Sequence, residues 1–414
     1  MADETEPKPE ARVLISDIFV VPTDQPHFEG PEGIKYDFNY GCRICIPKRD
    51  QPIYIKLTDA DTDQVFFDGV VDTSTESKTL TADQKWFHRW HFEIRHIDNT
   101  PLFDYVYDAK NQPVLIQCPR KCGMGDAIAW FTSAVEFQTK WECELYVFMP
   151  AYVASIFKST YTWIHFVTEP EIKSLKRYAT YYVGLFFGNE PAFQPEDFRI
   201  TGIHGSVASI LGVKWTGKPP RIEPTNKPPI EGKYVCIAAN ASAHYKHWNY
   251  PGGWMEIIDY LKSFGYRVLC IDRDKVLYRG EGILETIPYG SEDFTGNKPL
   301  QERINLLCGA DFFIGVGSGL AWLAWCCNIP TVMISGFSHP TSEFFTKYRV
   351  INYGVCNSCW NDLNCHINHK DPMWCPRHRK DEKVYECSRA ISPKMVKTTI
   401  DRVMHELVVM NKLK

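Results

Sequence analysis

The stretch "PVLIQCPRKCGMGDAIAWFTSAVEF", residues 113–137, places a short apolar run directly before a segment with helical periodicity. The run PVLIQC is typical of a buried strand, and DAIAWFTSAVEF is typical of a helix. The same alternation continues with ELYVFM, AYVASIF and IHFVT, and then with YYVGLFFG and GIHGSVASILGV. Alternating apolar strands and helices predict an α/β fold, in which a parallel sheet has helices on both faces.

A proline-rich segment separates this unit from a second unit of the same kind. The stretch TGKPPRIEPTNKPPIEGK contains five prolines, and we predict a linker over residues 216–232. Strand and helix segments resume with YVCIAA and GWMEIIDYLKSFG, and continue through YRVLCID, LQERINLLCGA, DFFIGV, SGLAWLAWCCN and TVMIS. We therefore predict two Rossmann-like domains, over residues 109–215 and 233–351, with a ligand-binding cleft between them.

The two ends of the chain differ from the β/α region. Residues 13–108 contain short aromatic and β-branched segments separated by turn residues, and predict a small β-barrel or sandwich domain. Residues 1–12 are acidic and proline-bearing, and predict a disordered tail. In residues 391–414, Ser392 and Pro393 occur in N-cap and first-turn order and predict a C-terminal helix. Its packing face would be an apolar stripe at Met395, Val396, Ile400, Val403 and Leu407.

The composition limits the classes of partner. The 414 residues are 44% hydrophobic and 23% charged, with a net charge of −4. These values are typical of a folded globular protein without a global field to attract nucleic acid. The sequence has no apolar run of the roughly 18 residues that a membrane helix needs, and its start lacks the pattern of a signal peptide. We expect a cytoplasmic protein with no nucleic-acid or membrane partner.

The stretch "CGMGDAIAW", residues 122–130, is the first candidate site. Gly123 and Gly125 allow a tight turn that brings backbone N–H groups, and the positive end of a helix, toward a ligand. Asp126 stands at the helix start, where its carboxylate could act only as a helix cap. Its expected position at the carboxyl edge of a parallel sheet, beside a cleft, also makes it a candidate catalytic group.

The stretch "ASAHYKHWNYPGGW", residues 241–254, follows the first strand of the second domain. Lys246 is a candidate phosphate ligand, and the neighbouring aromatic side chains would form a wall of the cleft. An exposed lysine beside packed aromatic residues is the alternative. The side chains concerned are His247, Trp248, Tyr250 and Trp254.

The stretch "DFFIGVGSGLAWLAW", residues 311–325, predicts a strand, a small-residue turn and a helix. The Ser318 hydroxyl and the free N–H groups at the helix start form a plausible diphosphate cradle. The lysine pattern of a P-loop and the full dinucleotide glycine spacing are both missing from it. Asp272, which ends the strand VLCID, is a candidate contact for a nucleotide ribose, with a strand-end cap as the alternative.

Together these motifs match the requirements of a sugar-nucleotide glycosyltransferase. Positive groups and helix dipoles hold the diphosphate leaving group, and a carboxylate removes the proton from the acceptor hydroxyl. Asp126 would be that base, and the lysine and the second glycine loop would bind the donor.

Residues 356–387 contain five cysteines and three histidines. Cys356 and Cys359 have the C-x2-C spacing of a metal knuckle, and Cys375 and Cys387 complete a tetrahedral set of four thiolates. Disulfides are the alternative, which a reducing compartment disfavours. Four sulfurs suit zinc or iron, and a closed ligand set favours a structural ion over a catalytic one. The finger would occupy residues 352–390, and Cys365, His366, His369 and His378 are left as spare residues.

The order of the motifs resembles that of the bacterial autotransporter heptosyltransferases, within the wider heptosyltransferase family. The resemblance covers the chain from about residue 20 to its end. It rests on GMGDAIAW, KHWNYPGGW, GSEDFTGNKPLQERINLLCGADFFIGVGSGLAWLAW, ISGFSHPTSEFFTKYRVINYGVCNSCW, WCPRH and YEC.

The resemblance implies a GT-B fold preceded by a β-barrel, a dodecameric homo-oligomer, and heptose transfer from ADP-heptose to serines of autotransporter adhesins, with inversion. It makes Asp126 the base, and it makes one structural Fe³⁺ per subunit, rather than zinc, the ion of the four cysteines. No divalent cation is expected in catalysis. The donor contacts that it implies are Gly123, Met124, Gly125, Lys246, Ser318, Gly319 and Leu320.

One departure concerns the second glycine loop. In the wider heptosyltransferases this loop usually follows the pattern D[ST]GLxH, whereas here Gly317 replaces the aspartate and Trp322 replaces the histidine. The difference favours the autotransporter-modifying branch over a lipopolysaccharide enzyme. Two alternatives stay open, namely another nucleotide sugar as donor and a non-catalytic scaffold that docks a partner through the metal finger.

Overall fold

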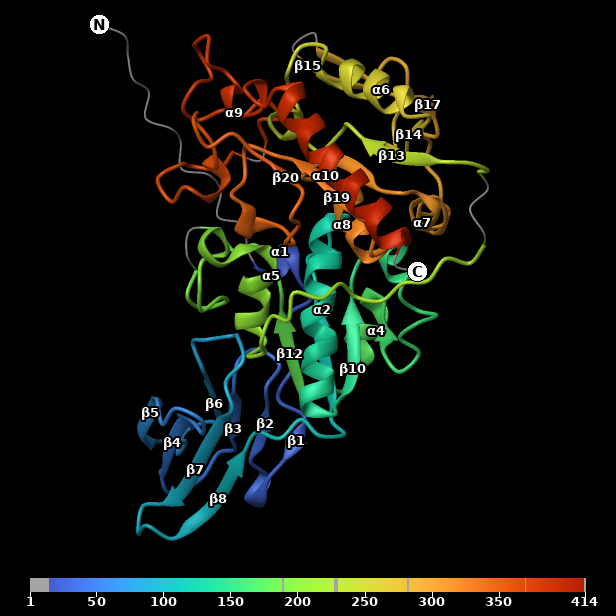
Figure 1. Ribbon diagram of the computed structural model, residues 1–414. Coiled ribbons are helices and arrows are strands. Elements are labelled where there is room, and N and C mark those ends of the chain that lie inside the picture. Colours follow the sequence, from blue (N-terminus) through green and yellow to red (C-terminus); the bar gives the residue numbers. More distant parts are fainter. Residues whose placement is uncertain (1–14, 188–189, 227–229, 281–282, 369, 413–414) are drawn as a thin grey trace, which may run out of the picture.

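The computed structural model describes residues 15–187, 190–226, 230–280, 283–368 and 370–412 (Figure 1). The predicted tail, residues 1–12, and His369 lie outside the described residues. A small β domain, two parallel-sheet lobes and a C-terminal helix follow one another along the chain.

The N-terminal domain consists of two four-stranded antiparallel sheets, in the orders β1-β2-β3-β6 and β5-β4-β7-β8. Buried and partly exposed residues alternate along β4, as a strand with one face on a core requires. Tyr36 of the first sheet packs against Phe92 and Tyr105 of the second, with ring centroids 5.6 and 4.6 Å apart. The domain is therefore described better as a sandwich than as a closed barrel. The strands are β1 Phe28–Glu29, β2 Lys35–Asp37, β3 Arg43–Ile46, β4 Ile53–Asp59, β5 Val65–Val71, β6 Lys78–Thr81, β7 Trp90–His96 and β8 Pro101–Val106; α1 Ile15–Ile18 and η1 Pro31–Gly33 accompany them.

The first lobe has a parallel sheet in the order β11-β10-β9-β12. The long helix α2 is the next element after β9, from which residues 118–123 separate it. It ends where Glu142 adopts a left-handed conformation. The predicted helix AYVASIF is helical only over its first four residues, and the predicted strand YYVGLFFG ends at Tyr182. The elements are β9 Pro113–Gln117, α2 Met124–Trp141, β10 Glu144–Phe148, α3 Ala151–Ala154, β11 His165–Phe166, α4 Glu169–Ser174, β12 Ala179–Tyr182 and α5 Phe198–Ile210.

The second lobe has a parallel sheet in the order β17-β14-β13-β18-β19-β20. Helix α10 starts at Pro393, and Ser392 Oγ accepts the N–H of Met395, which confirms the predicted start of the helix. Val396, Ile400 and Val403 are fully buried against the lobe. The elements are β13 Tyr234–Ala238, η2 His244–Lys246, α6 Gly253–Ser263, β14 Arg267–Cys270, β17 Glu292–Asp293, α7 Leu300–Gly309, β18 Phe313–Val316, α8 Gly319–Cys326, β19 Thr331–Ile334, η3 Pro340–Ser342, β20 Arg349–Val350 and α10 Pro393–Lys412.

Two insertions in the second lobe border the site. The antiparallel hairpin β15 Val276–Gly280 and β16 Ile283–Thr286 was not predicted from the sequence. The cysteine-rich segment between β20 and α10 has little regular structure, with η4 Cys359–Asn361 and α9 Glu386–Arg389.

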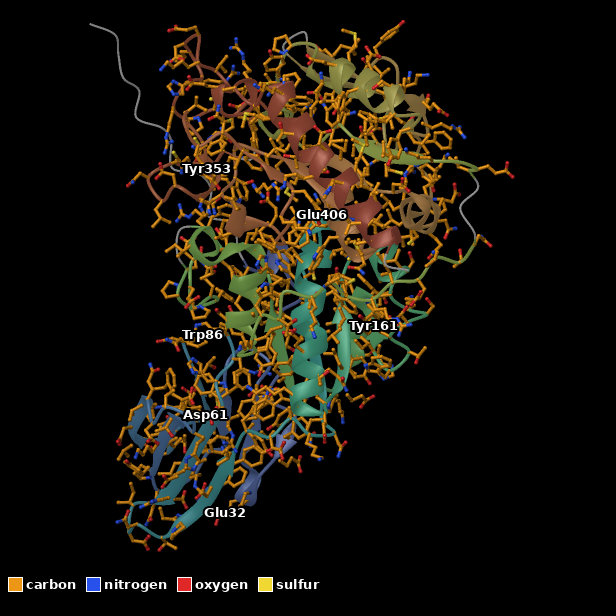
Figure 2. All side chains as sticks on the ribbon, viewed as in Figure 1. Glu32, Asp61, Trp86, Tyr161, Tyr353 and Glu406 are labelled. Carbon is orange, nitrogen blue, oxygen red and sulfur yellow. The ribbon has the colours of Figure 1, made fainter. Side chains whose placement is uncertain are left out.

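Polar contacts hold the linker and α10 against the lobes. Tyr161 of the first lobe accepts the N–H of Arg221 in the linker at 2.7 Å. Glu406 of α10 accepts the hydroxyl of Tyr348 at 2.8 Å; Tyr161 and Glu406 are labelled in Figure 2. Of the helices that the structure describes, none has both the length and the apolar character needed to cross a bilayer.

Candidate active site

A cavity of about 910 Å³ lies between the two lobes. The carboxyl ends of β9 and β18 lead into the turns that border it, as expected for ligand sites of parallel sheets. The structure brings all nine predicted catalytic and donor-binding residues to this cavity. These are Gly123, Met124, Gly125, Asp126, Lys246, Asp272, Ser318, Gly319 and Leu320.

The N-terminal ends of α2 and α8 meet at the cavity. A Cβ on Gly125 would lie 2.8 Å from Cδ1 of Trp322 and 3.4 Å from Cα of Gly319. A Cβ on Gly319 would lie 2.7 Å from Cε of Met124. The glycines therefore permit the close approach of the lobes. Two positive helix ends in one place favour the binding of an anion between them.

Asp126 occupies the third position of α2 and lines the cavity. Its carboxylate lies beside the backbone of Gly123, because a Cβ on Gly123 would lie 2.8 Å from Oδ2. The carboxylate thus stands at the helix start and at the cavity together, so neither role considered from the sequence is ruled out by its position. Burial in the cleft raises the pKa of Asp126, while the positive charge of Lys246 opposes that shift.

Lys246 comes from the opposite lobe, at the end of the single turn η2. Its Nζ lies 5.6 Å from the ring centroid of Phe337 and 5.8 Å from that of Trp360. Burial lowers the pKa of Lys246, and the negative charges of Asp126 and Glu343 oppose that effect. Lys246 is partly buried and lines the cavity, which argues against the alternative of an exposed lysine.

A buried hydroxyl of the loop before α8 and a buried carboxylate from the segment after η3 both line the cavity. Ser318 Oγ is buried and has no hydrogen-bond partner among the residues that the structure describes, so a ligand oxygen would satisfy it. A Cβ on Gly317 would lie 2.8 Å from Oε1 of Glu343. Glu343 is 5% exposed and is held by Ser338 Oγ and Arg349 Nη1, at 2.7 and 2.9 Å. The glycine that departs from the family loop leaves room for this carboxylate.

Asp272 lies at the edge of the cavity but is already engaged with backbone. Its carboxylate accepts the N–H groups of Ala239 and Asn240, at 2.9 and 3.2 Å, and the residue is 2% exposed. Burial raises the pKa of Asp272 to about 6. This geometry favours the strand-end cap over a ribose contact.

The aromatic residues after Lys246 do not line the main cavity. Trp248 is 4% exposed, donates its Nε1–H to the carbonyl of Ile391 at 2.8 Å, and packs edge-on against Trp254. Together with Tyr250 they belong to the core of the second lobe, while His247 and Trp248 border a separate pocket of about 220 Å³. The expected wall comes instead from Phe337 and Trp360, which sequence spacing did not reveal.

The four predicted cysteine ligands lie near one another within the finger, residues 352–390. Burial, followed by the charges of Cys375 and Cys356, raises the pKa of Cys387 to about 12. Burial and then Cys356 raise the pKa of Cys359. Among the described residues, the four sulfurs do not form a group with mutual distances within 4.8 Å, so the set is more open than a closed tetrahedron. Its chemistry nevertheless suits a thiophilic ion.

Two further contacts bear on this set. Arg377 Nη1 donates to Cys356 Sγ at 3.6 Å. Cys365, which was left out of the predicted set, donates to Asp362 at 3.5 Å. Trp360, next to Cys359 in sequence, lines the main cavity, so the finger also borders the candidate active site.

Comparison by family defines the class of the chain. The family "Glycosyltransferase family 9 (heptosyltransferase)" matches residues 209–372, which include the lysine turn and the second glycine loop. "Glycosyltransferase TibC, N-terminal domain" matches residues 30–98, within the sandwich. The chain is thus a glycosyltransferase of the heptosyltransferase class.

Full-length relatives narrow this class. The chain is 41% identical over 396 residues to autotransporter heptosyltransferase TibC of Escherichia coli O78:H11, covering 95% of each chain. It is 39% identical over 385 residues to the inactive autotransporter heptosyltransferase BimC of Burkholderia thailandensis, covering 92% of this chain and 88% of that one. The chain belongs to the autotransporter heptosyltransferase family.

Solved structures agree with this assignment. The dodecameric, iron-containing heptosyltransferase TibC in complex with ADP-D-β-D-heptose has a TM-score of 0.88, with 94% of this chain and 100% of that one covered at 41% identity. The E. coli ADP-heptose lipopolysaccharide heptosyltransferase II has a TM-score of 0.51, at 11% identity over 71% of this chain and 99% of that one. The second likeness shows a shared α/β fold.

Proposed function

We propose that this chain transfers heptose from ADP-heptose to serine hydroxyls of an autotransporter adhesin, with inversion at the anomeric carbon and Asp126 as the general base. The observation that carries the proposal is that an acid of one lobe and a lysine of the other meet in one cavity. The donor is supported by the likeness to TibC, which has been solved with ADP-heptose, and the acceptor class by the names of the relatives.

The proposed reaction uses the two lobes, in a GT-B arrangement, for different tasks. The serine oxygen attacks the anomeric carbon while Asp126 takes its proton, and the bond between that carbon and the diphosphate breaks. The electron pair leaves with ADP, whose added charge is stabilised by Lys246 and by the N–H groups of the α8 N-terminus. Attack from the face opposite the leaving group inverts the configuration. These groups supply the positive charge without a divalent cation.

The surroundings of Asp126 support its role as a base. A carboxylate with an ordinary pKa is a weak base, and burial raises the pKa of Asp126. Asp126 stands in the first turn of α2, so the helix places its carboxylate at the cavity before the acceptor binds.

We propose that Cys356, Cys359, Cys375 and Cys387 bind one structural iron ion as Fe³⁺, with zinc as the fallback. The cluster of thiols around Cys387 supports this site, and TibC is described as iron-containing. The ion would tie together a segment that has little regular structure, and would stabilise a subunit contact or an acceptor-docking surface. We expect Cys356→Ser to lose the metal. Unchanged metal content, assembly and activity in this variant would contradict the proposal.

The central experiment compares wild type with Asp126→Asn in a reaction with ADP-heptose and a co-expressed adhesin, followed by intact mass. We expect D126N to lose at least about 100-fold in rate, the lower range for general base catalysis, while still binding the acceptor. Asp274→Asn is the matched control, because Asp274 lines the same cavity but is half-exposed. Equal rates for D126N and wild type would contradict the role of Asp126.

One specific observation favours a second candidate, a non-catalytic scaffold: the relative BimC is described as inactive. A scaffold would show no mass gain with any donor and no response to D126N. A mass gain with another nucleotide sugar, but none with ADP-heptose, would point to that donor instead.

We also propose assembly into a dodecamer, which the description of TibC supports. Light scattering of the purified chain would test it, with a mass near twelve subunits expected. A monomeric mass would contradict it.

A further inference from the structure

The hairpin of β15 and β16 presents one face to the candidate active site. In its antiparallel register Leu277 lies opposite Glu285, and Tyr278 lies opposite Leu284. Opposite residues share a face and successive residues alternate, so Leu277 and Glu285 lie on one face and the other pair on the reverse. Leu277 lines the main cavity, whereas Tyr278 and Leu284 are exposed. Glu285 therefore belongs to the inward face.

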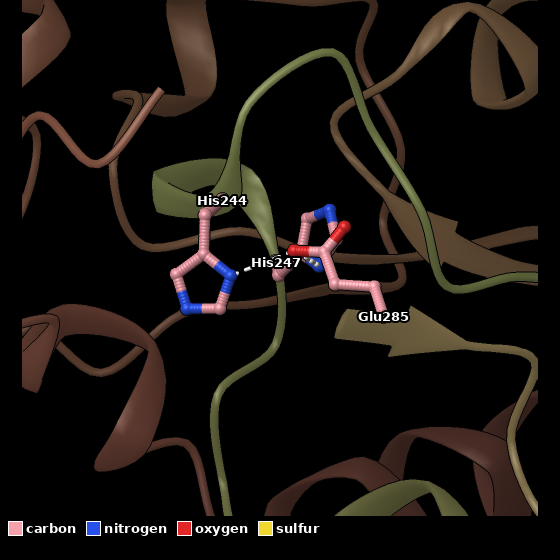
Figure 3. Close-up of side chains that lie close together, drawn as sticks. All are labelled: His244, His247 and Glu285. Carbon is pink, nitrogen blue, oxygen red and sulfur yellow. Dashed lines mark hydrogen bonds and ion pairs between the residues drawn. The ribbon is translucent and has the colours of Figure 1, made fainter. Parts of the chain in front are cut away.

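Glu285 joins this hairpin to the turn that carries Lys246 (Figure 3). Its Oε1 lies 2.7 Å from Nδ1 of His244 and 3.2 Å from Nδ1 of His247. The side chains of Glu285 and His247 are 8% and 9% exposed. His247 Nε2 accepts the backbone N–H of Ala241 at 3.1 Å, which places the ring hydrogen of neutral His247 on Nδ1, facing Glu285.

The same three side chains are close enough to be considered as a metal site, since their ligand atoms lie within 4.8 Å of one another. A metal ion would need the lone pair of His247 Nδ1. That nitrogen carries the hydrogen when Nε2 accepts from Ala241. The arrangement is therefore a polar cluster in which one carboxylate is hydrogen-bonded to His244 and lies 3.2 Å from Nδ1 of His247.

Two members of the cluster precede and follow Lys246 in the sequence. The turn η2 has only three residues, too few for a helix to be stable by itself. His244 and His247 flank Lys246, so contacts to both fix the backbone from which the amine extends. The His244 N–H also donates to the carbonyl of Pro372 in the finger at 2.9 Å.

We propose that Glu285 is a positioning residue, which holds the turn from His244 to His247 so that Lys246 faces the phosphates of the donor. The inference rests on the proposed function, because it assigns Lys246 to the diphosphate. Charge-assisted hydrogen bonds are strong enough to fix such a turn, and a small displacement of a phosphate-binding group costs affinity.

The test measures ADP binding to the full chain by calorimetry. We expect Glu285→Gln to weaken ADP binding about tenfold, the factor that corresponds to the loss of one charge-assisted hydrogen bond. Glu292→Gln is the matched control: Glu292 pairs with Arg267 at 2.5 Å on an exposed strand, so its loss should leave affinity unchanged. His244→Gln should reproduce the effect of E285Q, and provides a second route if E285Q folds poorly.

If Glu285 acts by positioning Lys246, then the effect of E285Q on ADP affinity requires the lysine. In a Lys246→Met background, E285Q should cause no further loss of ADP affinity, because its effect passes through the lysine. An equal loss in both backgrounds would indicate a merely structural role and overturn the inference. Equal ADP affinity of wild type and E285Q would also overturn it. One metal ion fewer per chain in E285Q than in wild type would show a metal site instead. ADP binding absent even in wild type would count against the proposed function itself.

Discussion

Replacing Gly125 by alanine tests the contact that brings the two lobes together. The added Cβ would lie 2.8 Å from Cδ1 of Trp322, about 0.6 Å closer than the 3.4 Å at which ordinary contacts begin. Trp322 is 3% exposed and packs edge-on against Trp325 and Phe344, with centroids 5.5 and 5.0 Å apart. Because the ring is packed against these two side chains, we expect the strain to move α2 away from α8.

Two losses are expected in G125A. Overpacking lowers the stability, and displacement of one lobe from the other lowers kcat/KM. Inserting a methyl group into a tight contact costs about 1–3 kcal/mol of stability. The proposed base lies on α2 and the proposed diphosphate-binding groups lie on the other lobe, so a shift of several tenths of an ångström should lower kcat/KM by about 10- to 100-fold.

Initial rates with ADP-heptose and acceptor, together with urea denaturation, measure both effects of G125A. Gly69→Ala is the control, because a Cβ there would make only an ordinary contact, 3.6 Å from Phe67. We expect G69A to behave as wild type. A folded G125A variant with wild-type kcat/KM would refute the reasoning that this contact sets the geometry of the site. Loss of ADP affinity without loss of stability would show that Gly125 acts only by touching the donor.

Two further predictions concern pH and the core. A base works only when deprotonated, so kcat/KM should fall as the pH drops through the pKa of Asp126, which burial raises above the ordinary value of about 3.9. Lys246→Met removes the charge that lowers this pKa, so the acid limb of the pH–rate profile should move to higher pH; an unmoved limb would contradict the interaction of the two groups. Ile400→Ala, at a fully buried position of α10, should lower the free energy of unfolding in urea by about 2–5 kcal/mol. Val409→Ala, at a position 42% exposed on the same helix, should change it by less than about 0.5 kcal/mol; equal losses would contradict the assigned face of the helix.

The local pattern of the sequence was sufficient for the elements that carry the site. Residues 113–137 contain both the strand β9 and the start of α2, and residues 311–325 contain β18 and α8. In each case a strand, a glycine turn and a helix are neighbours along the chain, so apolar periodicity alone predicts them. The carboxyl edges of parallel strands then bring Asp126 and Ser318 to one cleft, as expected from the fold class.

Some parts of the site depend on residues that are far apart in sequence. The space beside Gly317 is occupied by Glu343, and the wall near Lys246 comes from Phe337 and Trp360. The hairpin that carries Glu285 was not predicted, although its strands VLYRG and ILET contain aromatic and β-branched residues and are separated by glycines in the sequence. Neither periodicity nor spacing encodes which side chains meet there.

The sequence by itself determined the strand–turn–helix units that carry the site, and the motifs on which the resemblance to the family rests. Only the tertiary structure decided that Asp126 lines the cavity opposite Lys246, and that Trp248 belongs to the core instead of the cleft. The physical reason is the distance along the chain over which each effect acts. Backbone preference and apolar periodicity act over a few residues, whereas burial, pKa and pairing depend on whatever the folded chain packs beside a group.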